Sequence, residues 1–294
     1  MDPLVAESGV PGESVLVDVG DVRLHAVLAG PDDGPLAVLL HGFPECWYGW
    51  HRQIRPLVEA GYRVAVPDQR GYNRSDKPEG VSAYGLDRLA GDVVGLLDAL
   101  GRERAHLVGH DWGAAVAWWT ALHRPDRLAT LAAVNVPHPS VMARHLRHDW
   151  GQRLRSWYFL YLQVPALPER LARVGDYAPL VRTMRTSSNP GTFSATDFRR
   201  YRRAWRQPGA LTASMNWYRA VGRQRPRPAR EIVTVPTVVL WGVGDRFLET
   251  AMARESAVLC DDGRVRFVDG ATHWVQHERP GLVADELLAQ FERG

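Results

Sequence analysis

The strongest chemical signal in the sequence is an aspartate, Asp111, at the centre of the segment Gly109–Gly113. An apolar run precedes the segment and an Ala-rich run follows it. This pattern resembles the sharp strand-to-helix turn that presents a nucleophilic serine, with aspartate in its place. The two glycines fit, because such a turn strains the backbone of the central residue and leaves no room for side chains beside it. The helix N-terminus behind the carboxylate is expected to lower its pKa and keep it ionised.

A second interpretation of Asp111 needs no chemistry. Aspartate is among the residues preferred as helix N-caps, so Asp111 alone is equally compatible with a cap on the helix Trp112–Leu122. The other candidate residues decide between the two interpretations.

Three further segments with suitable chemistry follow apolar runs. His41–Pro44 stands where a loop that supplies an oxyanion donor is expected, with the backbone N–H of Phe43 as the candidate donor. Asp245 and His273 follow the last two apolar runs and are the candidate acid and base. The order Asp111, Asp245, His273 repeats the order nucleophile, acid, base along the chain. Each segment alone is a common turn, but together they predict one catalytic site.

The elements that must position these residues are short apolar runs separated by helical patterns. Continuous apolar runs are typical of strands buried on both faces, and their alternation with helices predicts a parallel sheet. Ser14–Val19 and Val22–Ala29 instead alternate apolar and polar residues, which predicts an antiparallel hairpin at the sheet edge. We expect buried strands at Leu36–Leu40, Tyr62–Val66, Ala105–Val108, Leu128–Val134, Thr237–Leu240 and Val265–Val268, and helices at Leu86–Leu97, at Trp112–Leu122, from Thr250 and from Arg279.

The strand signal disappears between residues 138 and 230, where Arg-rich helical patterns are broken by prolines. This span contains 18 basic and 4 acidic residues, whereas the rest of the chain contains 18 basic and 29 acidic residues. We therefore predict one α/β core in two parts, 1–137 and 231–294, interrupted by a helical cap domain at 138–230. Arg223–Arg230, with two prolines, is the expected return linker.

Composition excludes several classes of protein. The 294 residues are 45% hydrophobic and 23% charged, which is typical of a globular chain and not of a disordered one. The formal net charge of +3 gives no reason to expect nucleic acid as a partner. No apolar run approaches the roughly 20 residues of a membrane helix, so no membrane partner is expected.

The cysteine count and the first residues bear on the compartment. Cys46 and Cys260 are the only cysteines, which excludes a disulfide scaffold and a four-cysteine zinc site and favours a reduced compartment. The first residues lack the basic start and apolar stretch of a secretory signal. We therefore expect a cytoplasmic protein that needs neither a metal nor a cofactor.

The chain resembles the α/β-hydrolase superfamily and, within it, the epoxide hydrolases, from about Val15 onward. The segments that carry the resemblance are His41–Tyr48 (HGFPECWY), Pro67–Tyr72 (PDQRGY), Gly109–Gly113 (GHDWG) and Asn216–Arg219 (NWYR). The resemblance implies the α/β-hydrolase fold, with a mostly parallel central sheet, an N-terminal antiparallel hairpin and an inserted all-helical cap. It also implies epoxide and water as the substrates.

Epoxide hydrolases carry two cap tyrosines whose hydroxyls hold the epoxide oxygen. By this resemblance Tyr218 is one of them, and the other is Tyr158, with Tyr161 one helical turn away as the competing candidate. The same resemblance makes Trp112, Phe159 and Trp274 the expected substrate-binding residues, although Phe159 replaces a residue that is often polar in relatives. Both tyrosines are also compatible with simple packing on amphipathic cap helices.

These residues together are suited to opening an epoxide. Asp111 would attack carbon while Tyr158 and Tyr218 protonate oxygen, which leaves an ester on Asp111. His273, oriented by Asp245, would then deprotonate the water that attacks the ester carbonyl. The backbone N–H groups of Phe43 and Trp112 would stabilise the oxyanion.

Two other functions use the same residues. A haloalkane or haloacid dehalogenase shares the aspartate nucleophile and would use the indole N–H of Trp112 for halide. It has no need of the tyrosines, because halide leaves without a proton. A ligand-binding receptor on the same scaffold would have no use for the complete set Asp111, Asp245 and His273.

Several features stay open at this level. Glu45 is expected either to position water or to cap a helix, and His110 either to pack in the turn or to take part in the reaction. The basic cap either attracts anionic epoxides or is an ordinary solvated surface. The apolar content allows a homodimer.

Overall fold

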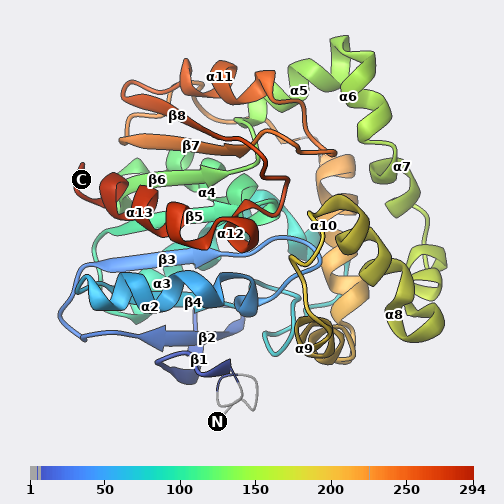
Figure 1. Cartoon of the computed structure of the whole chain (residues 1–294), viewed down its shortest axis with the longest axis horizontal. Helices are drawn as coiled ribbons and strands as arrows, with labels where there is room; N and C mark the ends of the chain where they lie inside the picture. The colour runs from blue at the N-terminus through green and yellow to red at the C-terminus, as the bar shows by residue number, and fades with distance from the viewer. Residues whose placement is uncertain (1–4, 6–7, 225) are drawn as a thin grey trace.

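The structure is a computed structural model that describes residues 5, 8–224 and 226–294. Its centre is an eight-stranded sheet with the order β1-β2-β4-β3-β5-β6-β7-β8 (Figure 1). The strands are β1 Glu13–Asp18, β2 Arg23–Ala29, β3 Leu36–Leu40, β4 Arg63–Pro67, β5 Ala105–His110, β6 Leu128–Val134, β7 Thr237–Gly242 and β8 Gly263–Val268.

The direction of the strands confirms the predicted sheet. β1 and β2 form an antiparallel hairpin, and β2 pairs antiparallel with β4. The pairs from β4 through β3, β5, β6 and β7 to β8 are all parallel. Every predicted strand is present, with ends that differ by no more than two residues. The carboxyl ends of the parallel strands therefore meet at one edge of the sheet, where ligand sites form in open α/β sheets.

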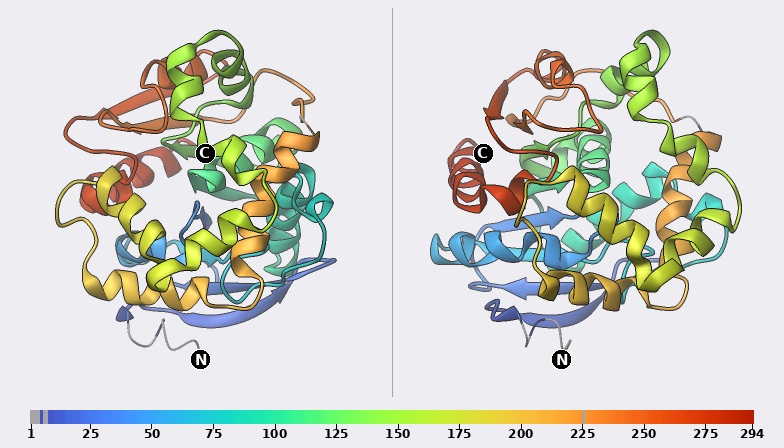
Figure 2. Two further views of the ribbon diagram at one scale, coloured as in Figure 1. Left: turned by 90° about the vertical axis from the view of Figure 1, so that its right-hand side faces the viewer. Right: turned by 45° about the vertical axis from the view of Figure 1, so that its right-hand side comes forward.

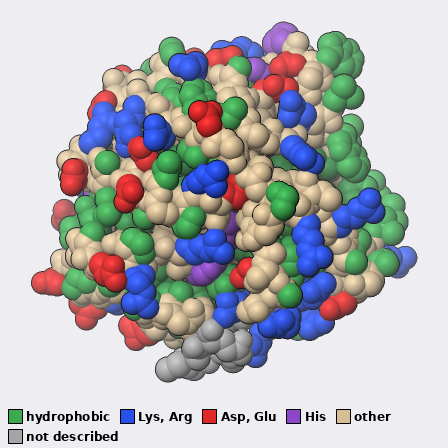
Figure 3. Space-filling model, viewed as in Figure 1, with side chains coloured by type: hydrophobic (Ala, Val, Ile, Leu, Met, Phe, Trp, Pro, Cys, Tyr) green, Lys and Arg blue, Asp and Glu red, His purple; other side chains and the backbone are tan. Residues whose placement is uncertain are grey.

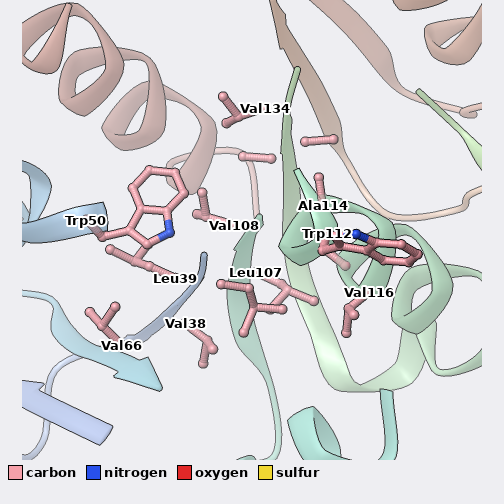
Figure 4. Close-up of a cluster of buried hydrophobic side chains, with 14 of the residues drawn as sticks. Val38, Leu39, Trp50, Val66, Leu107, Val108, Trp112, Ala114, Val116 and Val134 are labelled. Carbon is pink, nitrogen blue, oxygen red and sulfur yellow. The ribbon is translucent and has the colours of Figure 1, made fainter. Parts of the chain in front are cut away.

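The central strands are apolar on both faces because helices cover both faces. All five residues of β3 are buried, as are all six of β5. Figure 4 shows Val38, Leu39, Leu107 and Val108 of β3 and β5 packed between Trp50 on one side and Ala114 and Val116 on the other. Full burial of each such side chain contributes about 1.5–3 kcal/mol, so this layer anchors the strand ends that carry the candidate residues.

Helices pack against both faces of the sheet (Figures 1 and 2). α2 packs beside α13 on one face, and α3 packs beside α4 on the other. The predicted helices are confirmed, whereas α2 and α12 were not predicted. The bounds are α2 His51–Glu59, α3 Leu86–Ala99, α4 Trp112–His123, α11 Ala251–Ala257, α12 Val275–Glu278 and α13 Pro280–Phe291, with short 3-10 turns at Trp47–Trp50, Val81–Tyr84 and Pro125–Arg127.

The described part of residues 138–230 contains helices and loops without a strand. These helices lie beyond the carboxyl edge of the parallel strands, on the right in Figure 1 and toward the viewer in the left view of Figure 2. They are α5 Pro139–His148, α6 Trp150–Arg155, α7 Tyr158–Leu162, α8 Leu167–Ser187, α9 Ala195–Trp205 and α10 Ala210–Gln224. The division into core and cap stays a prediction, and we use "cap" below for this helical segment.

The break in α8 lies just before one of its two prolines, as the sequence predicts. Pro168 stands in the first turn, where proline is tolerated, and Pro179 lies inside the helix. The helical geometry is lost at Val174–Tyr177, directly before Pro179, where Gly175, Asp176 and Tyr177 have positive φ angles. A proline ring clashes with the carbonyl four residues earlier, here that of Gly175, so the break lies where Pro179 is expected to interrupt the helix.

A buried ion pair holds α10 inside the cap. Arg219 Nη1 donates to Glu169 Oε1 at 2.7 Å, and both side chains are only 6% exposed. Arg219 also donates to the carbonyl oxygens of Leu162 and Val164, at the end of α7. This cation thereby joins α7, α8 and α10, the helices around Tyr158 and Tyr218.

No helix among residues 5, 8–224 and 226–294 combines the length and the hydropathy that a transmembrane span requires.

We predict that Arg219→Met destabilises the fold by about 3–5 kcal/mol, because it leaves the Glu169 carboxylate buried without its partner. Urea unfolding followed by circular dichroism measures this. The control is Arg88→Met, which breaks the exposed pair with Asp21 and should cost at most about 1 kcal/mol. Equal losses in the two variants would contradict a structural role for the buried pair.

Candidate active site

Asp111 occupies a strained turn between β5 and α4. Its backbone has φ +50° and ψ −123°, a conformation that non-glycine residues rarely adopt. A Cβ at Gly109 would overlap the backbone of Gly113, and a Cβ at Gly113 would overlap the backbone of Leu40. The expectation that both positions exclude side chains is confirmed.

The side chain of Asp111 does not cap α4. It stands at the N-cap position, but makes no hydrogen bond to the helix amides. Its Oδ1 instead accepts from the backbone N–H of Phe43 at 2.8 Å, and its Oδ2 lies 3.5 Å from His273 Nε2. The carboxylate is therefore directed away from the helix and toward the groups expected to share its chemistry.

The loop after β3 comes close to Asp111 because residue 42 is glycine. A Cβ at Gly42 would overlap the Cβ and the carboxylate of Asp111. This close approach brings the N–H of Phe43 to the carboxylate, beside a cis peptide bond between Phe43 and Pro44. Trp112 follows Asp111 as the first residue of α4, and a role for its own N–H stays a prediction.

His273 lies between two carboxylates. Its Nδ1 is 2.8 Å from Asp245 Oδ2, while its Nε2 is directed to Asp111. His273 and Asp245 are buried, and the side chain of Asp111 is 18% exposed. The tertiary fold thus brings the ends of β5 and β7 and the loop after β8 into one line of three ionisable side chains.

Asp245 is held by four hydrogen bonds. Its Oδ1 accepts from the backbone N–H groups of Phe247 and Leu248 at 2.7 and 3.1 Å. Its Oδ2 accepts from Asn135 Nδ2 at 2.8 Å in addition to His273. With all these acceptor sites occupied, the carboxylate cannot rotate away and fixes the orientation of the imidazole.

The charges at the site shift the pKa values of Asp111 and His273 in opposite directions. Burial disfavours the charged form of each group, but for Asp111 the interaction with His273 outweighs it and lowers the pKa of the carboxyl. Burial likewise opposes protonation of His273, but Asp245 and Asp111 together raise its pKa to about 10. At neutral pH the site therefore rests with an ionised Asp111 and a protonated His273.

The cap places two tyrosines above Asp111. The ring centroids of Tyr158 on α7 and Tyr218 on α10 are 6.1 Å apart. Burial and the charge of Asp111 raise the pKa of both hydroxyls, so both tyrosines are neutral proton donors at any physiological pH. For Tyr161, burial and the charge of Glu169, rather than that of Asp111, raise the pKa of the hydroxyl.

Two cavities meet at these residues. One has a volume of about 860 Å³ and the other of about 380 Å³, and Asp111, Tyr158 and Tyr218 line both. His273, Phe43 and Tyr161 line the smaller one, and Phe159 lines the larger one. A small molecule in either cavity therefore reaches the carboxylate and both hydroxyls.

The expected substrate-binding residues surround this junction. The indole of Trp112 contacts the rings of Tyr218 and Phe159, with centroids 4.8 and 6.3 Å apart. Trp274 lines the smaller cavity and is held by its Nε1, which donates to Ser187 Oγ at 2.9 Å. The walls combine aromatic and aliphatic side chains, and Asp111, Tyr158 and Tyr218 are the polar residues that line both cavities.

Glu45 and His110 belong to a buried hydrogen-bond network that lies behind Asp111, Asp245 and His273. Glu45 Oε1 accepts from Tyr201 on α9 and is 2.6 Å from His277 Nε2, and its Oε2 accepts from Gln276 Nε2 at 3.1 Å. Glu45 lines neither of the two cavities at Asp111. The network connects the cap, through Tyr201, to the core.

His110 supports the backbone of the candidate base. A carbonyl oxygen only accepts, so His110 Nε2 must donate to the carbonyl of His273, 2.8 Å away. In neutral His110 this leaves Nδ1 as the acceptor for Gln276 Nε2, at 3.0 Å. His110 is therefore more than a packed residue of the turn, since it fixes the segment that carries His273.

The sequence analysis missed Asn135, Gln276, His277 and Tyr201. Asn135 had a detectable signal, because it is a polar residue directly after an apolar strand. Gln276 and His277 stand within four residues of His273. Tyr201 had no local signal, since its contact with Glu45 joins residues 156 positions apart.

Within the described ranges no cluster of three or more His, Cys, Asp or Glu side chains has a geometry that would hold a metal ion.

The family model described as the alpha/beta hydrolase fold matches residues 35–280. The chain is 48% identical to the AB hydrolase superfamily protein YfhM of Bacillus subtilis, over 94% of this chain and 96% of that protein. It is 36% identical to epoxide hydrolase A of Mycobacterium tuberculosis, over 95% of this chain and 97% of that protein. The solved structure of epoxide hydrolase A from Mycobacterium thermoresistibile is similar with a TM-score of 0.82 and 34% identity, covering 96% and 98% of the two chains.

We predict that Asp111→Asn lowers the pKa of His273 from about 10 toward the ordinary histidine range, because one of its two carboxylate neighbours loses its charge. NMR titration of the imidazole nitrogens measures the change. Asp285→Asn, an exposed position on α13, is the control and should leave this pKa unchanged. A His273 that titrates at the same pH in all three proteins would contradict the charge coupling.

Proposed function

We propose that this chain, which belongs to the α/β-hydrolase family and within it to the epoxide hydrolases, converts epoxides to vicinal diols through an ester on Asp111. One observation carries the proposal. The Asp111 carboxylate faces the junction of two cavities that the hydroxyl-bearing side chains of Tyr158 and Tyr218 also line. A nucleophile for carbon and proton donors for oxygen thus share one space.

The first step needs both halves of this arrangement. An Asp111 oxygen attacks an epoxide carbon, and the electron pair of the breaking C–O bond moves to the epoxide oxygen. That oxygen takes a proton from Tyr158 or Tyr218, because an alkoxide is a poor leaving group at neutral pH. The raised pKa of both tyrosines keeps that proton in place until negative charge develops on the epoxide oxygen.

Formation of the ester changes the charge balance at His273. The ester consumes the negative charge of Asp111, which is one of the two charges that raise the pKa of His273. His273 then gives up its proton more readily, and the tyrosine that lost a proton needs one. Transfer between them leaves a neutral imidazole and a neutral tyrosine, and so turns His273 into a base only after alkylation.

The second step uses the neutral imidazole. His273 takes a proton from water, which attacks the Cγ of Asp111, and the N–H of Phe43 is placed to stabilise the oxyanion. Collapse of the tetrahedral intermediate breaks the bond from Cγ to the substrate oxygen. That oxygen takes the second proton of the attacking water, and the diol is released. Asp111 returns as a carboxylate beside a protonated His273, which is the resting state.

The site residues follow from this scheme. Asp111 is the nucleophile, His273 the base, Asp245 the orienting acid, and Phe43 and Trp112 the oxyanion donors. Trp112, Phe159 and Trp274 form the aromatic walls of the substrate site. Asn135 positions Asp245, a role that the sequence analysis did not include.

The tyrosines also separate this function from its rivals. A dehalogenase releases a halide, which needs N–H donors and no proton. A receptor would not need His273 to be held between two carboxylates. A dehalogenase would therefore have no use for the hydroxyls of Tyr158 and Tyr218. A receptor would have no use for the position of His273 between Asp111 and Asp245.

The location of the protein is a further part of the proposal. Cys46 is buried and Cys260 is partly buried, and two cysteines in 294 residues are typical of a reduced compartment. We place the protein in the cytoplasm, with residues 138–230 acting as a cap domain that carries the tyrosines.

We predict that His273→Gln allows alkylation but slows ester hydrolysis by roughly 10²–10⁴-fold, because the base is lost. Intact-mass spectrometry after mixing with styrene oxide should show a covalent adduct with the mass of the epoxide. The double variant Asp111→Asn/His273→Gln is the control and should form none. Diol production by His273→Gln at the native rate, with no adduct, would overturn the two-step mechanism.

We predict that Tyr218→Phe and Tyr158→Phe each slow alkylation by roughly 10²-fold, because one proton donor is removed while the other remains. Tyr161→Phe is the matched control on α7 and should change the rate less than twofold. Stopped-flow tryptophan fluorescence under single-turnover conditions measures this step. A large loss in Tyr161→Phe with none in Tyr158→Phe would reassign the second tyrosine.

A further inference from the structure

The outer side of the cap exposes an unusual number of large apolar side chains. Twelve such residues are more than one-third exposed among the described residues, and eight of them fall between residues 150 and 174. Figure 3 shows hydrophobic side chains gathered along the right-hand edge of the molecule, where Figure 1 draws α6 and α7. We call these eight residues the outer cap face: Trp150, Leu154, Trp157, Leu160, Val164, Leu167, Leu171 and Val174.

The exposure is large for each of these side chains. Trp150 is 73% exposed, Leu154 72% and Leu160 78%. Scattered apolar residues are normal on a protein surface, but a contiguous group of this kind marks an interaction site. The outer cap face therefore needs an occupant in solution.

The charged residues around the face are mostly basic, and the acidic residues at its two ends, Asp149 and Asp176, lie beside His145 and beside Arg202 and Arg206. Arg153 packs over the ring of Trp150, and Arg170 and Arg173 are exposed beside Leu167 and Leu171 on α8. The only acidic residue between positions 150 and 175 is Glu169, which is buried and paired with Arg219. Glu249, which reaches the same region from the core, is paired with Arg155. The face thus combines apolar side chains, two tryptophans among them, with arginines.

We infer that the outer cap face binds the surface of a membrane that contains anionic lipids. Apolar side chains inserted at the headgroup boundary, with arginines beside them for lipid phosphates, are the features of interfacial binding. Tryptophan is enriched at this boundary because its ring is amphipathic. No spanning helix is needed, so this surface is compatible with the absence of long apolar runs in the sequence.

The charge of the cap favours lipid over a second copy of the chain. Two copies paired through this face would bring together segments that each hold 18 basic and 4 acidic residues. Such like-charge contacts are unfavourable, whereas an anionic lipid surface complements the charge.

The face also surrounds an entrance to the active site. Leu154, Trp157 and Leu171 of the face line the smaller cavity, whose inner end is formed by Asp111 and His273. A lipophilic epoxide dissolved in the membrane would therefore reach Asp111 through an apolar path. This consequence rests on the proposed function, while membrane binding itself does not.

Flotation of the full chain with lipid vesicles tests the inference. At low salt we expect binding to vesicles of phosphatidylcholine mixed with phosphatidylglycerol, and much weaker binding to phosphatidylcholine alone. Trp150→Ser/Leu160→Ser should weaken the binding at least about tenfold, since two inserted side chains are lost. Arg170→Gln/Arg173→Gln should weaken it at low salt and have little effect at high salt.

The matched control is Val258→Ser, because Val258 is 80% exposed at the end of α11 and outside the face. It should bind vesicles like the native chain. None of the substituted residues lines either catalytic cavity, so turnover of the water-soluble epoxide glycidol should be unchanged in every variant. Failure of the native chain to turn over any epoxide would refute the proposed function and leave the vesicle result standing.

Two results would overturn the inference. One is the absence of flotation with anionic vesicles, or flotation that Trp150→Ser/Leu160→Ser leaves unchanged. The other is a dimer in sedimentation velocity that this variant converts to a monomer while no protein floats, because the face would then be an interface between copies of the chain.

Discussion

The candidate active site depends on keeping a negatively charged Asp111 in a largely buried position. A carboxylate in such a place is costly unless it is paired and hydrogen-bonded, and here His273 and the N–H of Phe43 meet that requirement. Two carboxylates share one imidazolium, so the charges are coupled and any reaction at Asp111 changes the proton affinity of His273. The strained backbone at Asp111 and the glycine at position 42 serve the same arrangement. Together they allow the Asp111 carboxylate to approach the His273 imidazole and the N–H of Phe43.

The cap supplies what the core lacks. The ends of β5 and β7 and the loop after β8 carry the proposed nucleophile, acid and base. They carry no proposed proton donor for the opposite side of a substrate. Tyr158 and Tyr218 close that side, and their helices are joined by the buried cation of Arg219. Glu45 connects the same cap to the core through Tyr201, while Gln276 and His110 continue the network to the backbone of His273. Buried polar contacts therefore link the cap, which carries Tyr158 and Tyr218, to the core, which carries Asp111 and His273.

The cap has a second surface with a different character. Its inner side lines the two cavities at Asp111 with aromatic and aliphatic side chains, whereas the outer cap face is apolar, exposed and bordered by arginines. Because the smaller cavity opens between these two sides, the residues that would meet a membrane are continuous with those that would guide a lipophilic substrate. The positive charge concentrated in residues 138–230 is unexpected in a chain of net charge +3. In the proposed membrane binding, this charge attracts anionic lipids.

The sequence by itself determined the strands, most of the helices that flank them, and the turn that carries Asp111. These features depend on local periodicity, on glycine at crowded positions and on the order of residues at strand ends. Only the tertiary structure decided that Asn135 holds Asp245, that Glu45 faces Tyr201, and that Tyr158 lines both cavities at Asp111 whereas Tyr161 lines one. Each of these depends on contacts between residues far apart in the chain or on packing against another element. No local pattern encodes such contacts, because the energy that selects them arises only when the segments meet.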